Sequence, residues 1–316
     1  VEIVESRPGF CKFASLTLIP IDLSQVELDL LSEQEKAWLD ADTGFIHETR
    51  DQLTFLKASS KRAYRISNAN QAIAILHKAI QEAQTPPCGP VSVEIPIDIQ
   101  SAKIPASLVT APVKALPTVD VESRVVDELW SQLKQAKLPL LWLGGGALGC
   151  AEAVKKLADA GVTVISSTHA RGVLPDSHRG SLRAFHNSPS IEAVISACDF
   201  TLVAGSRLRS NETRSWTLEL PHPRVQIDID PAAASRNYLM DNTIIANCSA
   251  LLSALAEKVQ GREWGNAQWD ALVGSAVTKA EQDLRAQCGE YAKLNDAIAN
   301  ALPEDGLLVR DITVSG

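Results

Sequence analysis

Apolar residues recur at two different periods along this chain, and the alternation between the two periods predicts an α/β fold. From Asn68 to Gln84 they recur every three or four positions, the spacing of a helix with one buried face, and Asn68 is placed to cap that helix. The segment "TPPCGP" ends the helix, and "VSVEIPID" then predicts a buried strand that Pro96 terminates.

Beyond Val119, short apolar runs alternate with segments of helical period. Strands are expected over 138–143, 162–167, 200–206 and 224–230, and helices over 121–136, 147–160, 188–198 and 248–259. Continuously apolar strands are typical of a parallel sheet that helices cover on both faces. We therefore expect residues 119–260 to form a doubly wound α/β domain.

Two segments interrupt this alternation. Residues 101–118 are polar, aperiodic and rich in proline, which predicts an interdomain linker. A second connector precedes two helices, expected over 267–287 and 291–302, and one last strand over 307–312. A lone strand has no partner left in the sequence, so we expect a last domain that this chain does not complete.

Composition and charge narrow the function classes. The 316 residues allow two or three domains, and 45% hydrophobic with 22% charged residues is ordinary globular composition. The net charge of −8 argues against a nucleic-acid partner, and no apolar run predicts a membrane span or a signal peptide. Six dispersed cysteines without a CxxC pair predict packed thiols in a reducing, cytoplasmic compartment and no structural zinc site.

Gly144, Gly146 and Gly149 satisfy the G-x-G-x-x-G pattern between an expected strand and an expected helix. An NAD site needs an acidic residue at the end of the second strand, about 20 residues on. That strand ends in "VISSTHARG", which has no acid, so NAD is disfavoured. Two alternatives stay open: a structural tight turn, or a differently arranged nucleotide such as FAD.

Asp228 and Asp230 end another strand, where open α/β sheets bind ligands. They are candidates for a ribose or adenine contact, and Asp230 is also placed to cap the segment that begins at Pro231. The histidines are scattered and predict no catalytic triad.

Several segments together resemble the thiamine diphosphate-dependent enzymes of the acetolactate synthase and 2-oxoacid decarboxylase type. "CGPVSVEIPIDIQ" resembles the end of the pyrimidine-binding domain. "LLWLGGGA", "RGVLPDSHRGSL", "ACDFTLVAGSRL" and "VQIDIDPAAASRNY" occur in the order of the central domain, and "ALPEDGLLVRDITVSG" resembles the first strand of the diphosphate-binding domain. The similarity covers roughly residues 44–316, whereas residues 1–43 match the pattern poorly.

This resemblance implies four parts. Residues 1–100 correspond to the C-terminal part of the pyrimidine-binding domain, 101–118 to a linker, 119–260 to a Rossmann-like central domain, and 265–316 to a truncated start of the diphosphate-binding domain. The implied fold is a doubly wound parallel-sheet central domain flanked by incomplete α/β thiamine diphosphate-binding domains.

The resemblance also implies cofactors and site residues. Thr313, Ser315 and Gly316 correspond to the turn near the thiamine diphosphate, and His47, Glu48 and Gln52 to a segment at the active-site mouth. In members that hold FAD, the matching positions are Gly144, Gly145, Gly146, Arg207, Asp228 and Asp230, with His186 near the flavin. Many members keep the glycines without a flavin, and the loop "SSTHARG" differs from that of the FAD-binding members.

The activating glutamate of the family is expected upstream of Val1. The Gly-Asp-Gly motif that binds magnesium is absent from the sequence. We therefore assign no catalytic and no metal-binding residue, and we expect a fragment of a thiamine diphosphate- and magnesium-dependent enzyme that is inactive as given. "HETRDQ" and "RDITVSG" are most similar to decarboxylases of 2-oxoacids with a long basic chain, such as 2-ketoarginine.

Family enzymes build each active site across a dimer interface, so a full-length form is expected to be a dimer or tetramer that acts on a small 2-oxoacid. A non-catalytic module that binds FAD through residues 120–260 is the alternative. A third hypothesis, similarity to the NAD-dependent deoxyhypusine synthases or sirtuins, is disfavoured because no acid follows "VISS".

Overall fold

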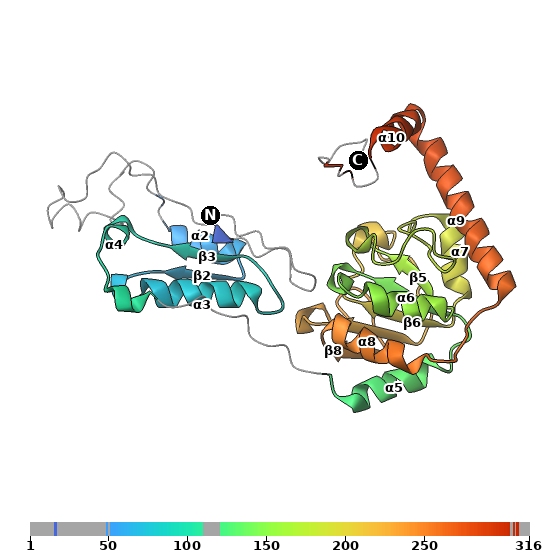
Figure 1. Ribbon diagram of the computed structural model, residues 1–316, viewed down its shortest axis with the longest axis horizontal. Helices are drawn as coiled ribbons and strands as arrows, with labels where there is room; N and C mark the ends of the chain where they lie inside the picture. The colour runs from blue at the N-terminus through green and yellow to red at the C-terminus, as the bar shows by residue number, and fades with distance from the viewer. Residues whose placement is uncertain are drawn as a thin grey trace. The chain divides into compact units, whose positions relative to one another are not determined.

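The computed structural model describes residues 16–17, 49, 51–109, 121–303, 306, 308 and 309. The chain forms two compact units, an N-terminal unit of residues 1–119 and a C-terminal unit of residues 120–316 (Figure 1). Of the expected strand over 307–312 the structure describes only residues 308 and 309, and the second half of the expected linker, residues 110–118, lies outside the described residues.

The N-terminal unit contains a three-stranded parallel sheet in the order β1 (Leu16–Thr17), β3 (Val91–Glu94) and β2 (Arg62–Arg65). Helix α2 (Gln52–Ser59) and helix α3 (Ala72–Gln84) cover opposite faces of this sheet (Figure 1). The expected helix is confirmed: a 3₁₀ turn at Ala69–Gln71 continues into α3, and the Asn70 amide donates to the Asn68 side chain at 2.9 Å.

The C-terminal unit is built on a five-stranded, wholly parallel sheet, as the apolar strands predicted. Its strand order is β5-β4-β6-β7-β8. The strands are β4 (Pro139–Leu143), β5 (Thr163–Ser166), β6 (Phe200–Ala204), β7 (Arg224–Asp228) and β8 (Asn242–Ile245). β8 was missed because its residues are only half buried and lack the continuous apolar run of the other four strands.

Helices cover both faces of this sheet. One face packs against α5 (Ser123–Leu133), α6 (Ala151–Asp159) and α8 (Cys248–Lys258), and the other against α7 (Pro189–Ala197) and α9 (Ala267–Cys288). Alternation along β4 divides the two cores, because Leu141 and Leu143 lie in the first and Leu140 and Trp142 in the second. The doubly wound architecture is confirmed.

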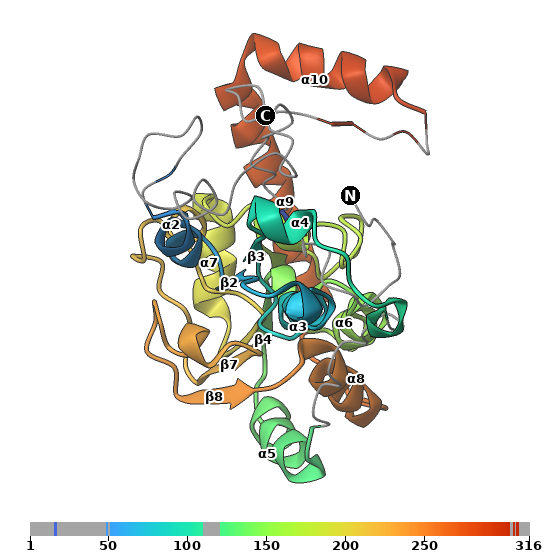
Figure 2. The same ribbon diagram turned by 90° about the vertical axis from the view of Figure 1, so that its left-hand side faces the viewer.

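Helix α9 packs against the sheet with only part of its length. Its buried residues run from Trp269 to Ala280, and the Trp269 indole nitrogen donates to Thr163 Oγ1 at 2.9 Å. Beyond that point α9 leads to α10 (Glu290–Ala301), which turns away from the axis of α9 at Gly289 (Figure 2). Among the described residues, no helix has the length and hydropathy that crossing a bilayer requires.

We expect Trp269→Phe to lower the free energy of unfolding by about 1–3 kcal/mol, because it leaves the buried Thr163 hydroxyl without its donor. Thr163→Val should lower the free energy of unfolding by a similar amount. In the double variant both polar partners are gone, so its loss should be smaller than the sum of the two single losses. Urea denaturation of the four chains measures this coupling, and strictly additive losses would contradict it.

Candidate functional site

The candidate site is the carboxyl edge of the five-stranded sheet, which we define as the loops that follow β4, β5, β6 and β7. Numbered within the unit, the strand order is 2-1-3-4-5, so the topological switch point lies between β4 and β6. Open α/β sheets bind ligands at that point. The sequence-predicted residues Gly144–Gly146, Arg207, Asp228 and Asp230 all follow or end these strands, so the fold brings them to one edge.

At the switch point the backbone of the loop after β4 touches the backbone of the loop after β6. A Cβ atom on Gly144 would lie 2.1 Å from the Gly205 carbonyl oxygen, and one on Gly146 would lie 2.8 Å from Gly205 Cα. Gly205 itself has a φ of +60°, which side chains disfavour. Only glycine fits these three positions. Gly145 differs, because a Cβ there would meet only His169 Cβ, at 3.4 Å.

The amides of this turn are already engaged. Gly144 N donates to Ala204 O at 2.8 Å and Gly146 N to Gly205 O at 3.0 Å. A 3₁₀ turn, Gly145–Ala147, separates β4 from α6, which begins only at Ala151 and not at 147 as the periodicity predicted. The geometry therefore favours the structural alternative for Gly144 and Gly146, since neither offers its amide to a diphosphate.

The two aspartates at the end of β7 have different surroundings. Asp228 is 8% exposed, and burial raises the pKa of its carboxyl above the ordinary 3.8, while Asp228 Oδ1 accepts from Asp230 N at 2.9 Å. Asp230 accepts from Ala232 N at 2.9 Å and so caps the 3₁₀ turn Pro231–Ala233. The capping interpretation of Asp230 is confirmed. Its second oxygen lies 3.3 Å from Arg207 Nη2.

Exposed cations gather along the carboxyl edge. Arg171 follows β5, Arg207 and Arg209 follow β6, and Arg236 follows β7. The carboxylates near them are partly buried or paired: Asp230 bonds Arg207, and Glu212 is 2% exposed and accepts from Thr168 N at 3.2 Å. In a chain of net charge −8 this edge is locally cationic, which favours an anionic ligand.

His186 is buried near Trp142 of β4. It is 7% exposed, its ring centroid is 6.3 Å from that of Trp142, and burial lowers its pKa. His186 Nδ1 and Trp142 Nε1 are buried and have no hydrogen-bond partner among the described residues. Sequence periodicity could not have indicated this environment, because His186 lies in a polar loop that only the tertiary structure buries.

The loop after β6 has an unusual backbone. Leu208, Arg214, Ser215 and Trp216 all have positive φ, between 47° and 65°. Such a backbone costs free energy at non-glycine residues and persists only where surrounding contacts hold it. Here the Trp216 indole donates to Leu208 O at 3.1 Å and Asn187 Nδ2 donates to Asn211 O at 2.8 Å. No sequence signal predicted this conformation.

The remaining predicted site residues fall elsewhere. Gln52 is the first residue of α2 and is half-buried, whereas His47, Glu48, Thr313, Ser315 and Gly316 lie outside the described residues. The described part of the chain contains no cluster of three potential metal ligands.

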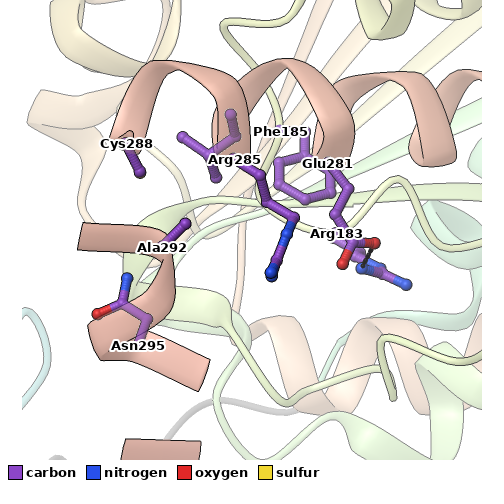
Figure 3. A pocket seen from close by; sticks show the side chains of 8 residues that line it. Arg183, Phe185, Glu281, Arg285, Cys288, Ala292 and Asn295 are labelled. Atoms are coloured by element: carbon purple, nitrogen blue, oxygen red, sulfur yellow. Dashed lines mark hydrogen bonds and ion pairs between the residues drawn. The ribbon is translucent and has the colours of Figure 1, made fainter. Parts of the chain in front are cut away.

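A small cavity of about 210 Å³ lies between α9, α10 and the loop that carries Arg183 and Phe185 (Figure 3). Arg183 Nη1 bonds Glu281 Oε2 at 3.1 Å, and Arg285 Nη1 bonds Asp296 at 3.0 Å. Because each guanidinium has a carboxylate partner, this cavity carries no excess charge to select an ion.

Comparison with known proteins finds two family models. The central domain of thiamine pyrophosphate enzymes matches residues 126–255, which include β4 to β8 and the whole carboxyl edge. The C-terminal region of peptidase M24 matches residues 9–55, most of which lie outside the described residues. The second match covers the segment that resembled thiamine diphosphate enzymes poorly, and it also includes His47, Glu48 and Gln52.

The curated relatives include acetolactate synthases, a decarboxylase and an oxidase. The large subunit of acetolactate synthase isozyme 1 from Escherichia coli is 24% identical over 80% of this chain and 46% of its own length. A Pseudomonas aeruginosa protein described as a 2-ketoarginine decarboxylase is 24% identical over 98% of this chain and 57% of its own. Pyruvate oxidase from Lactiplantibacillus plantarum is 28% identical over 71% and 40%. The chain spans about half the length of these relatives.

A solved structure from Mycobacterium smegmatis, described as that of a thiamin diphosphate-dependent enzyme, superimposes with a TM-score of 0.55. Its sequence is 26% identical to this chain, and the match covers 66% of this chain and 41% of that one.

We expect Gly144→Ala to lower the free energy of unfolding by about 3 kcal/mol or more, because its Cβ would overlap the Gly205 carbonyl. The matched change Gly145→Ala should alter stability by less than about 0.5 kcal/mol. Thermal or urea denaturation measures both. Equal effects would show that the contact with Gly205 is not what requires glycine at 144.

Asp228→Asn should stabilise the protein at neutral pH. Folding raises the pKa of Asp228, so the contribution of Asp228 is fully present below the unfolded pKa and is lost as the pH rises through the folded value. Asparagine removes the buried charge and keeps the oxygen that accepts from Asp230 N. The gain should be present at about pH 7 and absent at about pH 3.

Asp241→Asn is the matched control with the opposite sign. The Arg224 amide and His222 hold the pKa of Asp241 below its ordinary value, so its contribution is present above the unfolded pKa and is lost as the pH falls. This variant should be less stable than the wild type at neutral pH. Melting temperatures across the pH range measure both effects, and a change of the same sign in the two variants would contradict the assignment.

Proposed function

Since the chain belongs to the thiamine diphosphate-dependent enzymes, we propose that it forms the central domain and adjoining segments of a thiamine diphosphate- and magnesium-dependent enzyme acting on 2-oxoacids. The match of residues 126–255 to the family's central domain carries this proposal. It is supported by the parallel sheet in 2-1-3-4-5 order and by relatives that include an acetolactate synthase and a 2-ketoarginine decarboxylase.

Bound thiamine diphosphate would supply the electron sink that decarboxylation of a 2-oxoacid needs. In this chain Thr313, Ser315 and Gly316 are the residues we propose near its diphosphate, and His47, Glu48 and Gln52 those at the active-site mouth. Magnesium in this family is held through a Gly-Asp-Gly motif, which these 316 residues do not contain.

The contribution of the described residues is structural support. The close contact of Gly144 and Gly146 with Gly205 fixes the loops after β4 and β6 relative to each other. The strained loop after β6 is held by the indole of Trp216 within it and by Asn187, which lies before α7. A rigid carboxyl edge positions whatever ligand binds there without the entropy cost of ordering loops.

For the substrate we propose a 2-oxoacid with a long basic chain. The segments "HETRDQ" and "RDITVSG" suggested this class, and the Pseudomonas aeruginosa relative described as a 2-ketoarginine decarboxylase aligns over 98% of the chain. Decarboxylation and acetolactate synthase-like carboligation both occur among the relatives. The full-length form is proposed to be a cytoplasmic homodimer or homotetramer.

A non-catalytic FAD-binding module is the second candidate. The exposed arginines Arg171, Arg207, Arg209 and Arg236 favour it, because they offer charge to an anionic cofactor at the switch point. On this reading Arg207, Asp228 and Asp230 contact FAD, while Gly144, Gly145 and Gly146 support the turn beneath it.

One preparation of the 316-residue chain tests both candidates. With thiamine diphosphate, magnesium and pyruvate or 2-ketoarginine, we expect no turnover above a heat-inactivated control, because we place the family's activating glutamate upstream of Val1 and the sequence lacks the Gly-Asp-Gly motif. Turnover above that control would contradict the prediction. An acid extract of the same preparation should be free of flavin if the chain acts only as a scaffold, whereas a stoichiometric flavin that Arg207→Gln abolishes would favour the FAD module.

A further inference from the structure

The N-terminal unit has a cavity that the proposed function does not use. It has a volume of about 630 Å³ and lies between one face of α3 and the start of β2. We call it the basic groove; its lining residues are Lys61, Arg62, Ala74, His77, Lys78, Gln81, Glu82 and Thr85. Pockets for small ligands have volumes of roughly 300–1,000 Å³, so the groove is large enough for a metabolite.

Positive charge is concentrated around this groove. The chain as a whole has 38 acidic and 30 basic residues, yet Glu82 is its only acidic residue from 52 to 93. The same segment carries Lys57, Lys61, Arg62, Arg65 and Lys78. Of these cations Lys61, Arg62 and Lys78 line the groove, so the lining has three cations and one carboxylate.

The groups that would repel an anion are already neutralised. Lys61 Nζ donates to Glu82 O at 2.7 Å and to Thr85 O at 2.8 Å, which offsets the negative end of the α3 dipole. Glu82 Oε2 lies 3.4 Å from Arg62 Nε. Burial, together with the nearby Glu82 carboxylate, raises the pKa of Tyr64 to about 12. The single carboxylate of the groove is therefore already paired with a cation.

Arg62 and Lys78 still have cationic donors that can bind a ligand. The ion pair with Glu82 is made through Arg62 Nε, which leaves the two terminal amino groups of this 64% exposed side chain for a second anion. Lys78 Nζ lies 5.9 Å from the centroid of the Tyr64 ring, and within the described part of the chain no carboxylate forms an ion pair with it. Arg62 and Lys78 reach the groove from two different elements, β2 and α3.

We propose that the basic groove binds a small multivalent anion of the phosphate class, with Arg62 and Lys78 as its ligands. The excess of two positive charges matches a dianion better than a single carboxylate. The planar guanidinium of Arg62 provides two parallel donors for phosphate oxygens, and the ammonium of Lys78 provides a point charge beside them.

Titration calorimetry of the full chain with inorganic pyrophosphate, at constant ionic strength, tests this site. We expect saturable binding of one pyrophosphate, weakened roughly tenfold by Lys78→Gln or by Arg62→Gln, the loss typical of one charge-assisted hydrogen bond. Lys57→Gln is the matched control: it removes the same charge from α2, on the opposite face of the sheet (Figure 1), and should change the affinity by less than about twofold.

Three results would overturn the proposal. Without saturable heat below about 10 mM pyrophosphate there is no site of useful affinity. Equal weakening by Lys57→Gln and Lys78→Gln would indicate unspecific attraction to the surface of the unit. Binding that Arg207→Gln abolishes and Lys78→Gln leaves intact would place the anion at the carboxyl edge of the other unit.

Discussion

The contact of Gly144 and Gly146 with Gly205 is the constraint on which the C-terminal unit depends. It brings the backbones after β4 and β6 closer than any side chain allows, at the point where the strand order reverses. In a dinucleotide-binding fold glycines at this place expose amides to a diphosphate. Here the amides of Gly144 and Gly146 donate to Ala204 and Gly205 instead. The same sequence pattern therefore has a different physical use, which is to bring the loops after β4 and β6 into contact and to fix the loop that carries Arg207.

The charged residues of the carboxyl edge fall into two groups that differ in burial. Asp228, Glu212 and His186 are buried among loops, and burial opposes the charged forms of Asp228 and His186. Arg171, Arg209 and Arg236 stay exposed, so the edge as a whole is cationic although the chain is acidic. Positive charge also gathers in the basic groove of the N-terminal unit, where Lys61 and Glu82 are held by neighbouring groups. The net charge of the chain alone indicates neither the cationic carboxyl edge nor the basic groove.

How much of the fold the sequence predicts depends on how completely an element is buried. β4, β5, β6 and β7 are buried on both faces, so each is a continuous apolar run that pattern alone identifies. β8 is half buried and was missed. β2 was missed as well, since "RAYR" is polar at most positions and becomes a strand through pairing with β3. The limits of α9 were predicted well because one apolar stripe continues from Trp269 to Ala280 and Asn266 caps the helix.

For the site, the sequence by itself determined the residue types at the carboxyl edge: glycines after β4, arginines after β6 and aspartates after β7. The sequence also places these residues at one edge, because parallel strands end at the same edge whatever their order. Only the tertiary structure decided that Gly205 lies against Gly144, that Asp230 pairs with Arg207, and that His186 and Glu212 are buried. The physical reason is the same for each. These properties depend on residues tens of positions apart, and only the packing of the folded chain brings such residues together.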